Sequence, residues 1–450
     1  MKPNNQLTKQ AFLLTGALVA SGAAAQAQSA DALIDKLVNK GILTADEAQE
    51  LRAQSDEGFT AAYKAKTGMP EYVDAMRFKG DFRGRYEGFF KDTPGFVDRN
   101  RFRYRVRFGV TIDLMDDFEV GFRLGSGDIS GINAGISGVD PISNNQTFQD
   151  NGAKKGIFID LAYATWRPLK GPIWSSSTTI GKMNNPFVFS SMVFDSDYSP
   201  EGVAQGIGYR VNDIHTLNSA FGAFVLDEVG GSSRDPYLFG GQVRLESSWN
   251  ADWKSSFGVA MLSVINRDRL RNNDVLNINV GNDRDPVTTA PVYAFNTVVV
   301  DGALTYTIEN GIPMYNAKFP ITLAADYLHN NSAAEDGTGY SVGIQFGKSG
   351  KRGLWDVGYT YKHLEGNAWY EEFLNSDSGA YYPSALANSG QGIGYRAGTN
   401  IKGHEVKVQY SPFDAITFGL AGYFLEAVNP TPGPGGSDIV RVQADAQLKF

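Results

Sequence analysis

Cysteine is absent from this 450-residue chain, and histidine occurs only four times. The absence of cysteine excludes a disulfide scaffold, a cysteine-ligated metal centre and a cysteine nucleophile. After residue 30 no stretch has the ~18 uninterrupted apolar residues of a spanning helix, which excludes a helical membrane protein. The net charge of −8 argues against general nucleic-acid binding. What remains is a chain rich in glycine and aromatic residues.

Residues for catalysis or metal binding do not form a recognisable pattern. The histidines are His215, His329, His363 and His404. None lies in a nucleophile motif, and no two have the H-x-x-x-H spacing of a metal site. Asp195 and Asp197 could suit calcium, but their surroundings lack the glycine and distal glutamate of an EF-hand loop. We therefore predict no enzyme activity, no metal and no cofactor.

The N-terminus has the features of a secretory signal peptide. Lys2 and Lys9 precede the apolar run 11–20, and the triplet Ala-Gln-Ala at 25–27 fits a cleavage site. The apolar run is too short to span a membrane. We predict a signal peptide at 1–27 and export of the remainder.

Residues 28–73 are predicted to form a separate helical segment in the periplasm. Apolar residues between Ala32 and Val38 are spaced for one face of a helix, and Gly41 is placed to end it. Thr44-Ala-Asp-Glu47 has the pattern of a capping box that opens a second helix. A spacer and a contact with a partner or the cell wall remain equally open as its role.

From residue 74 to 450 the chain consists of segments in which apolar and polar residues alternate. In one segment the even positions from Phe102 to Leu114 are apolar, whereas the odd positions from 101 to 107 are all arginine. A period of two indicates a strand with one apolar and one charged face. The sixteen predicted strands are 76–90, 100–114, 117–127, 155–167, 175–184, 204–211, 214–227, 237–249, 252–264, 297–308, 318–329, 338–348, 353–364, 402–411, 414–426 and 439–450.

The length and aromatic content of these strands favour a closed membrane barrel over a soluble sandwich. A barrel strand needs ~9–11 residues, and the barrel must close because lipid offers no hydrogen bonds to the backbone. An arginine facing lipid costs ~2–4 kcal/mol at mid-bilayer, so four in one strand would cost up to roughly 8–16 kcal/mol. The arginines are therefore predicted to face the lumen, and the aromatic residues to face lipid.

Later strands are assigned in the same way. The odd positions from Ile157 to Tyr163 are predicted to face lipid, opposite Asp160. In the last strand the even positions from Val440 to Phe450 are predicted to face lipid, and the residues between them to face inward.

The connections support a count of sixteen. Short links, such as 115–116 and 212–213, alternate with long ones, notably 128–154, 265–296 and 365–401. Short periplasmic turns alternating with long external loops are typical of outer-membrane barrels. An even count places both termini in the periplasm; fourteen or eighteen strands remain alternatives.

Candidate functional residues lie in the lumen. The first two strands would project a basic wall: Arg77, Lys79, Arg83, Arg85, Arg101, Arg103, Arg105 and Arg107. The third long loop, 185–203, carries the acids Asp195, Asp197 and Glu201. If this loop folds inward, its acids face the arginines across a narrowed pore and create a transverse field that favours hydrated solutes. A structural role, in which the arginines pair with neighbouring acids, is compatible with this.

Several stretches carry a resemblance to the Gram-negative outer-membrane porins, in particular to a porin family with a helical segment before the barrel. They are IDLAYATWRP at 159–168, TIGKMNNPF at 179–187, FDSDYSPEGVA at 194–204, GHEVKVQYSP at 403–412 and the terminal Phe450. The resemblance covers residues 76–450, and the order and spacing of the stretches are more specific than any one of them.

The resemblance implies a 16-stranded barrel in the outer membrane, in contact with lipid and lipopolysaccharide. It implies a homotrimer that passes small hydrophilic solutes passively, with 185–203 as the constriction loop and Phe450 as the residue read by the barrel-assembly machinery. Two alternatives stay open: a substrate-selective channel for anions such as phosphate, and an adhesin or envelope-tethering barrel. Loops 128–154, 265–296 and 365–401 have no predicted role.

Overall fold

A computed structural model describes residues 37–38, 44, 48–49, 69–93, 96–128 and 139–450. The chain divides into two compact units, Met1–Asp74 and Ala75–Phe450. In the first, residues 37–38 and 48–49 are helical, and the Ala48 N–H donates to the Thr44 carbonyl at 3.0 Å. The predicted signal peptide and most of the predicted helical segment lie outside the described residues. Within the described part of the chain, no helix is long and apolar enough to cross a membrane.

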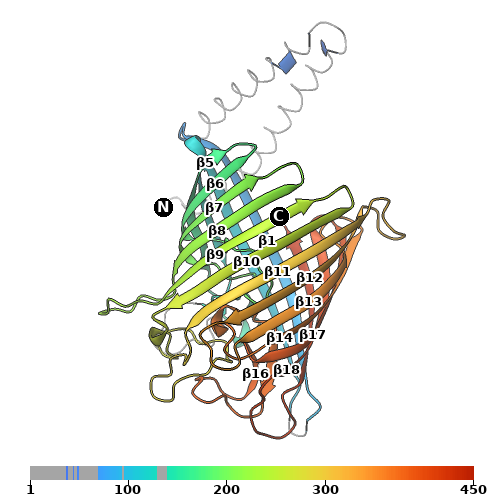
Figure 1. The fold of residues 1–450 in the computed structure, drawn as a ribbon. Helices are drawn as coiled ribbons and strands as arrows, with labels where there is room; N and C mark the ends of the chain where they lie inside the picture. The colour runs from blue at the N-terminus through green and yellow to red at the C-terminus, as the bar shows by residue number, and fades with distance from the viewer. Residues whose placement is uncertain (1–36, 39–43, 45–47, 50–68, 94–95, 129–138) are drawn as a thin grey trace, which may run out of the picture. The chain divides into compact units, whose positions relative to one another are not determined.

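The second unit is a closed antiparallel barrel (Figure 1). Its strands are β1 (Val73–Phe90), β2 (Arg99–Leu114), β3 (Phe118–Gly125), β5 (Phe158–Lys170), β6 (Trp174–Lys182), β7 (Glu201–Arg210), β8 (His215–Val225), β9 (Tyr237–Ser248), β10 (Trp253–Ile265), β11 (Phe295–Ile308), β12 (Phe319–Asn330), β13 (Thr338–Gly347), β14 (Leu354–Leu364), β17 (Ile401–Phe413), β18 (Ile416–Ala427) and β19 (Ile439–Lys449). Each of these strands pairs with the next, and β1 also pairs with β19, from Asp81↔Lys449 to Phe90↔Val440. This last pairing closes the barrel.

The remaining elements are short and belong to the connections. They are the strands β4 (Gln146–Thr147), β15 (Gly379–Tyr382) and β16 (Gly394–Ala397), and the 3₁₀ helices η1 (Met115–Asp117), η2 (Asp150–Gly152), η3 (Arg267–Arg269) and η4 (Glu371–Phe373). β4 extends the sheet beside β2, whereas β15 and β16 pair only with each other.

The predicted count of sixteen barrel strands is confirmed, and the predicted strand ends differ from the observed ones by at most three residues. The predicted facing of β2 also holds: Phe102 is 58% exposed on the outer surface, whereas Arg103 is 9% exposed. The cost of turning arginine toward lipid explains this facing, because an outward aromatic side chain loses nothing in hydrocarbon.

The facing predicted for β5 is correct at Ile159 but wrong at Leu161 and Tyr163. The register of β3 and β5 shifts between two pairs, Arg123↔Leu161 and Leu124↔Ile159, so Asp160 is an extra residue. A bulge of this kind reverses the side-chain alternation beyond it. Ile159 accordingly faces outward at 57% exposure, whereas Leu161 is 5% exposed and the Tyr163 hydroxyl donates to Glu119 at 3.0 Å inside the barrel.

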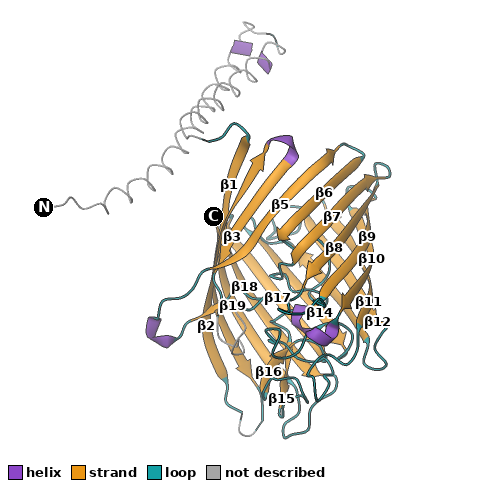
Figure 2. Ribbon diagram, turned by 90° about the vertical axis from the view of Figure 1, so that its left-hand side faces the viewer, coloured by secondary structure: helices purple, strands orange, loops and turns teal. Residues whose placement is uncertain are grey.

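The main hydrophobic core lies inside the barrel rather than between two sheets. The connections 183–200, 266–294 and 365–400 contribute its centre, including Val193 and Trp369, which are fully buried. Figure 2 shows these loops gathered at one end of the barrel, while the short turns lie at the other. A buried ion pair between Arg284 and Glu371 joins two of the three connections. Packed chain thus occupies much of the long-loop end.

Candidate functional site

The basic residues of β1 and β2 form one connected wall in the lumen, with Arg77 and Lys79 outside it. Arg105 and Arg107 share the carboxylate of Asp81, at 2.8 and 2.7 Å. Arg83 and Arg103 both donate to Asn145, at 2.7 and 3.1 Å. We call the six arginines of this network, together with Arg441 of β19, the arginine wall: Arg83, Arg85, Arg101, Arg103, Arg105, Arg107 and Arg441.

Two of the eight predicted residues lie toward the short-turn ends of the strands. The Arg77 guanidinium binds the Asp113 carboxylate and is half exposed. Lys79 is exposed, and the described residues offer it no ion-pair partner. Neither side chain contacts the other predicted basic residues.

The predicted constriction segment reaches across the lumen. Near its start, the Val188 carbonyl accepts hydrogen bonds from Gln242 at 2.8 Å and Arg244 at 2.9 Å, both on β9. Near its end, Asp197 pairs with Arg107 at 3.0 Å and Arg105 at 3.3 Å, both on β2. Five full-length strands separate β2 from β9 in the sheet. One short segment therefore contacts two distant parts of the barrel wall.

Of the three predicted acids, only Asp197 contacts the arginine wall. Asp195 turns the other way: its carboxylate accepts the Ser376 N–H at 3.0 Å, and its own N–H donates to Phe373 at 2.7 Å. Glu201 begins β7 and pairs with Lys182 at 2.8 Å on the adjacent strand. The expectation that all three stand opposite the arginines is therefore wrong in its geometry, because the chain reverses direction between 195 and 197.

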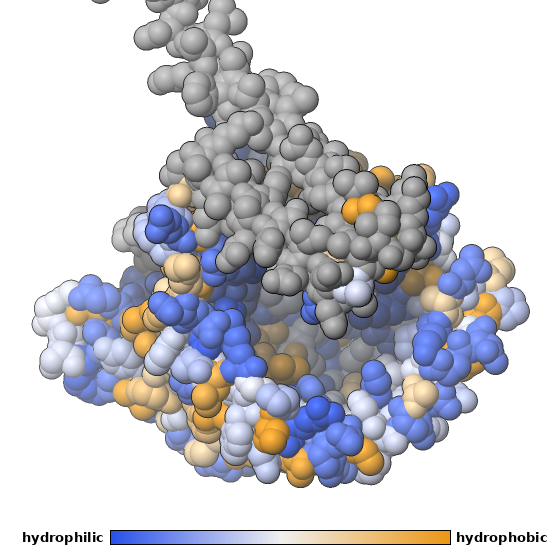
Figure 3. Space-filling view, turned by 90° about the horizontal axis from the view of Figure 1, so that it is seen from above, coloured by the Kyte–Doolittle hydropathy of each residue, from blue (hydrophilic) through white to orange (hydrophobic). Residues whose placement is uncertain are grey.

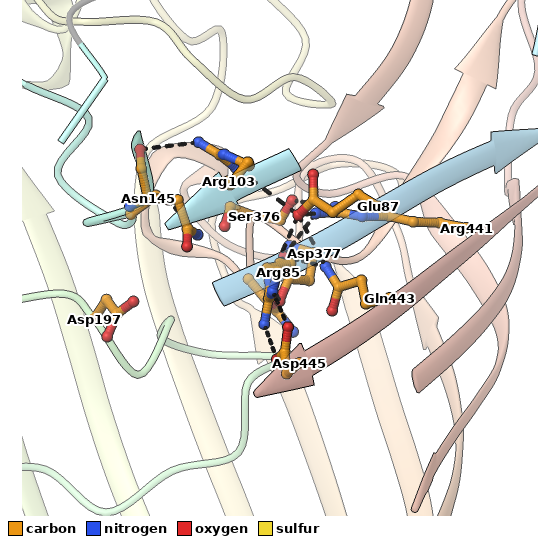
Figure 4. A network of polar contacts seen from close by, with 12 residues as sticks. Arg85, Glu87, Arg103, Asn145, Asp197, Ser376, Asp377, Arg441, Gln443 and Asp445 are labelled. Carbon is orange, nitrogen blue, oxygen red and sulfur yellow. Dashed lines mark hydrogen bonds and ion pairs between the residues drawn. The ribbon is translucent and has the colours of Figure 1, made fainter. Parts of the chain in front are cut away.

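A second acid from a connection, Asp377 of 365–400, also contacts the arginine wall. Figure 4 shows Asp377 between β1 and β19. It accepts hydrogen bonds from Arg441 at 2.8 Å, Gln443 at 2.9 Å and Arg85 at 3.1 Å. Although burial alone would raise it, the pKa of Asp377 lies well below its ordinary value because Arg85 and Arg441 favour the carboxylate. Connection 365–400 is thereby tied to the barrel wall.

Arg441 connects the wall on the β19 side. It is 1% exposed, donates to Glu87 at 2.8 Å, and stacks on the rings of Phe89 and Tyr395 with its guanidinium carbon 5.2 and 5.3 Å from their centres. The sequence pattern placed Arg441 inward, but it did not show that β19 lies beside β1. Asp377 could not be identified from the sequence as a residue of the site, because it lies in a connection that has no periodic pattern.

The arginine wall is not fully neutralised by its acids. Arg83 has no carboxylate partner among the described residues, and the nearest one to Arg103 is Glu87 at 3.9 Å. The Nε atoms of both arginines are buried without a hydrogen-bond partner. The charges of Arg83 and Arg103 are therefore the least balanced in the wall, in contrast to those of Arg85, Arg105 and Arg107, which are held by carboxylates.

Open space remains on the short-turn side of segment 183–200. A cavity of about 590 Å³ there is lined by polar side chains, including Glu119, Arg167 and Gln242. Figure 3, viewed from the short-turn end, shows a hollow bordered largely by hydrophilic residues. The four histidines lie in β8, β12, β14 and β17. Within the described ranges no group of three or more His, Asp or Glu side chains is placed to hold a metal.

A pH rise is expected to loosen the contact between segments 183–200 and 365–400. Burial, then Asp197, raises the pKa of Asp195 to about 8, and burial, then Glu371, raises that of Glu372 to about 8. A raised carboxyl pKa means that the folded state favours the protonated form. Its stabilisation is therefore complete at acidic pH and is lost as the pH rises through about 8.

Hydrogen exchange tests this expectation. After correction for intrinsic rates, the Ser376 amide should exchange faster at pH of about 9 than at about 6. Asp195→Asn should remove part of the difference, because an amide cannot ionise. Equal protection at both values would show that these carboxyls do not control the contact.

Comparisons with known proteins agree with this architecture. A family model described as "Putative porin" matches residues 94–298. Among solved structures, Pseudomonas putida OprB is similar at 12% identity, covering 88% of this chain and 97% of its own, with a TM-score of 0.51. Salmonella typhi OmpF is similar at 8% identity over 83% and 97%, with a TM-score of 0.45. No curated protein matches the sequence. The predicted resemblance to outer-membrane porins is confirmed.

Proposed function

We propose that this porin-type passive channel of the outer membrane carries small hydrophilic solutes and ions past a charged constriction built by segments 183–200 and 365–400. The observation that carries the proposal is the pairing of Asp197 with Arg105 and Arg107, since the same segment is fastened to β9 at Val188. A passing solute would meet this crossing segment within the lumen. The porin fold and family match support a channel, whereas the choice of solute is the proposal.

The charges suggest how such a constriction would select. Asp197 and Asp377 of the crossing segments pair directly with arginines on β1, β2 and β19, so a solute that passes the constriction meets charged groups rather than an apolar surface. Charged and dipolar solutes can exchange hydration for these groups, whereas apolar solutes gain nothing. Arg83 and Arg103, whose charges are balanced least by nearby carboxylates, add a positive bias to one wall. They are the specific observation that favours the second candidate, an anion-selective channel.

Planar-bilayer recording separates the two candidates. A general channel should give a large conductance that rises with salt concentration without saturating. An anion-selective channel should instead saturate with its solute, because a binding site limits the flux. Failure of the folded barrel to conduct would contradict both.

Replacing Arg83 and Arg103 together by glutamine is expected to shift the permeability ratio toward cations. The shift should be large at ~0.01 M salt, where screening extends over ~30 Å, and small at ~1 M, where it extends over ~3 Å. Reversal potentials in a salt gradient measure it. Arg210→Gln at the short-turn end provides a control with the same chemistry. An unchanged ratio at low salt would place both arginines outside the ion path.

The remaining features of the proposal concern the membrane. We expect the short-turn end to face the periplasm and the long-loop end to face lipopolysaccharide, as in porin-type barrels. The barrel would assemble as a homotrimer. Phe450 is exposed, and its backbone N–H donates to the Gly80 carbonyl at 3.0 Å, extending the β1–β19 pairing. A role of its side chain as a signal for the assembly machinery remains part of the proposal.

A further inference from the structure

A second cavity, of about 980 Å³, lies at the long-loop end, and seven of the residues that line it are acidic. Strand ends and five connections of the barrel enclose it, and Lys182 is its one basic lining residue. Three of the lining acids have cationic partners: Asp160 pairs with Arg123, Glu201 with Lys182, and Asp274 with Arg271. These three need no ligand.

Four further lining acids have no ion-pair partner in the described part of the chain: Asp140, Asp227, Glu228 and Glu372. They come from three connections: 126–157, the one between β8 and β9, and 365–400. Burial raises the pKa of Asp140 to about 6, and also raises that of Asp227. The cavity thus gathers carboxyl groups that have no cation beside them, and a bound cation would favour their ionised forms.

Glu372 supplies an independent sign of a missing ligand. Glu372 is only 6% exposed, and its Oε2 atom accepts a hydrogen bond from the Ile278 N–H at 2.9 Å. Oε1 is buried without any hydrogen-bond partner, although Glu372 lines the cavity. A buried oxygen left without a donor is costly, and an N–H group of a bound molecule would remove that cost.

The chemistry of the lining limits what could bind. No group of three or more His, Asp or Glu side chains among the described residues is placed to hold a metal ion. Phe158, Tyr370 and Phe373 also line the cavity, and aromatic rings attract ammonium groups and pack against apolar groups. The lining therefore suits a cation that has N–H donors at one end and an apolar body.

We propose that this cavity is a binding site for small organic primary amines with an aromatic or alkyl body, whose ammonium group donates to Glu372 while the body packs on the aromatic rings. The inference rests on the proposed function only in that such a solute enters through the channel. Binding at equilibrium does not require conduction, so the two ideas can fail separately.

Calorimetric titration of the folded full-length protein with phenethylamine tests the site. Saturable binding is expected, and it should weaken about tenfold or more in Glu372→Gln, because a charge-assisted hydrogen bond is lost. Phenylethanol, which has the same body without the charge, should bind far more weakly. Asp213→Asn, an exposed acid at the short-turn end, should leave the affinity unchanged.

Asp227→Asn provides a second variant on a different element, and it should also weaken binding if Glu372→Gln does not fold. Absence of saturable binding would overturn the inference, as would equal binding of phenylethanol, or an equal loss in Asp213→Asn. If the channel conducts without binding phenethylamine, only this site is lost. If it binds without conducting, the site stands and the proposed function falls.

Discussion

Replacing residues 368–398 by a short turn between β14 and β17 is expected to raise the single-channel conductance by about two-fold or more, because conductance follows the open cross-section. This connection carries Trp369, Phe373 and Asp377 into the barrel, and it supports segment 183–200 through the bond from Trp369 Nε1 to the Val193 carbonyl at 3.0 Å. Its removal should open the lumen and free the crossing segment at once. Planar-bilayer recording and the size cutoff for sugars measure the effect.

Two further deletions make the result specific. Removing 189–200 should enlarge the conductance less, because connection 365–400 would remain in place. Removing the exposed tip 229–233 of the β8–β9 connection is the control and should change little; glycines there have no atoms near their Cβ positions. If only the 189–200 deletion widens a correctly folded pore, then segment 183–200 alone forms the constriction.

Arg441→Ala is expected to lower the free energy of unfolding of the barrel by about 3–5 kcal/mol, because it leaves Glu87 and Asp377 as buried carboxylates without their main partner. Glu87 retains Arg101, and Asp377 retains Arg85, so the barrel should still form. The loss of Arg441 should also release connection 365–400 from β19 and make the channel current noisier. Denaturant titration in lipid vesicles measures the first effect, and single-channel recording the second.

Arg210→Ala is the matched control, since the Arg210–Asp213 pair is exposed and such pairs contribute little. If Arg441→Ala has the same free energy of unfolding as the unmodified protein, then the other arginines already compensate Glu87 and Asp377. A less stable but quiet channel would separate the two roles and would leave Arg441 without a part in holding 365–400.

The strands of this barrel could be predicted because the signal for each is local. Lipid on one side and water on the other force an alternation that is visible within one segment, as in Phe102 and Arg103. The same logic fails at Asp160, because a bulge changes the facing without changing the composition. Leu161 and Tyr163 therefore face the lumen, although their apolar character predicted otherwise.

The candidate site could be predicted only in part, for a related reason. The sequence shows the arginines of β1 and β2 at alternating positions, which indicates that they share one face. It shows that 185–203 contains acids, but not where they point. Which acid meets which arginine depends on the path of a connection, and a connection has no periodicity. Asp197 pairs with Arg105 and Arg107, whereas Asp195 turns to Ser376 and Glu201 to Lys182.

The sequence by itself determined the class of the protein, because the rule that sorts side chains between lipid and lumen acts on each strand separately. It also predicted sixteen strands, with fourteen and eighteen as alternatives, and the barrel has sixteen. Only the tertiary structure decided what closes the arginine wall: β19 lies beside β1, and connection 365–400 brings Asp377 to Arg441. Contacts between residues tens to hundreds of positions apart leave no mark on the local pattern, since each partner alone is an ordinary inward or loop residue.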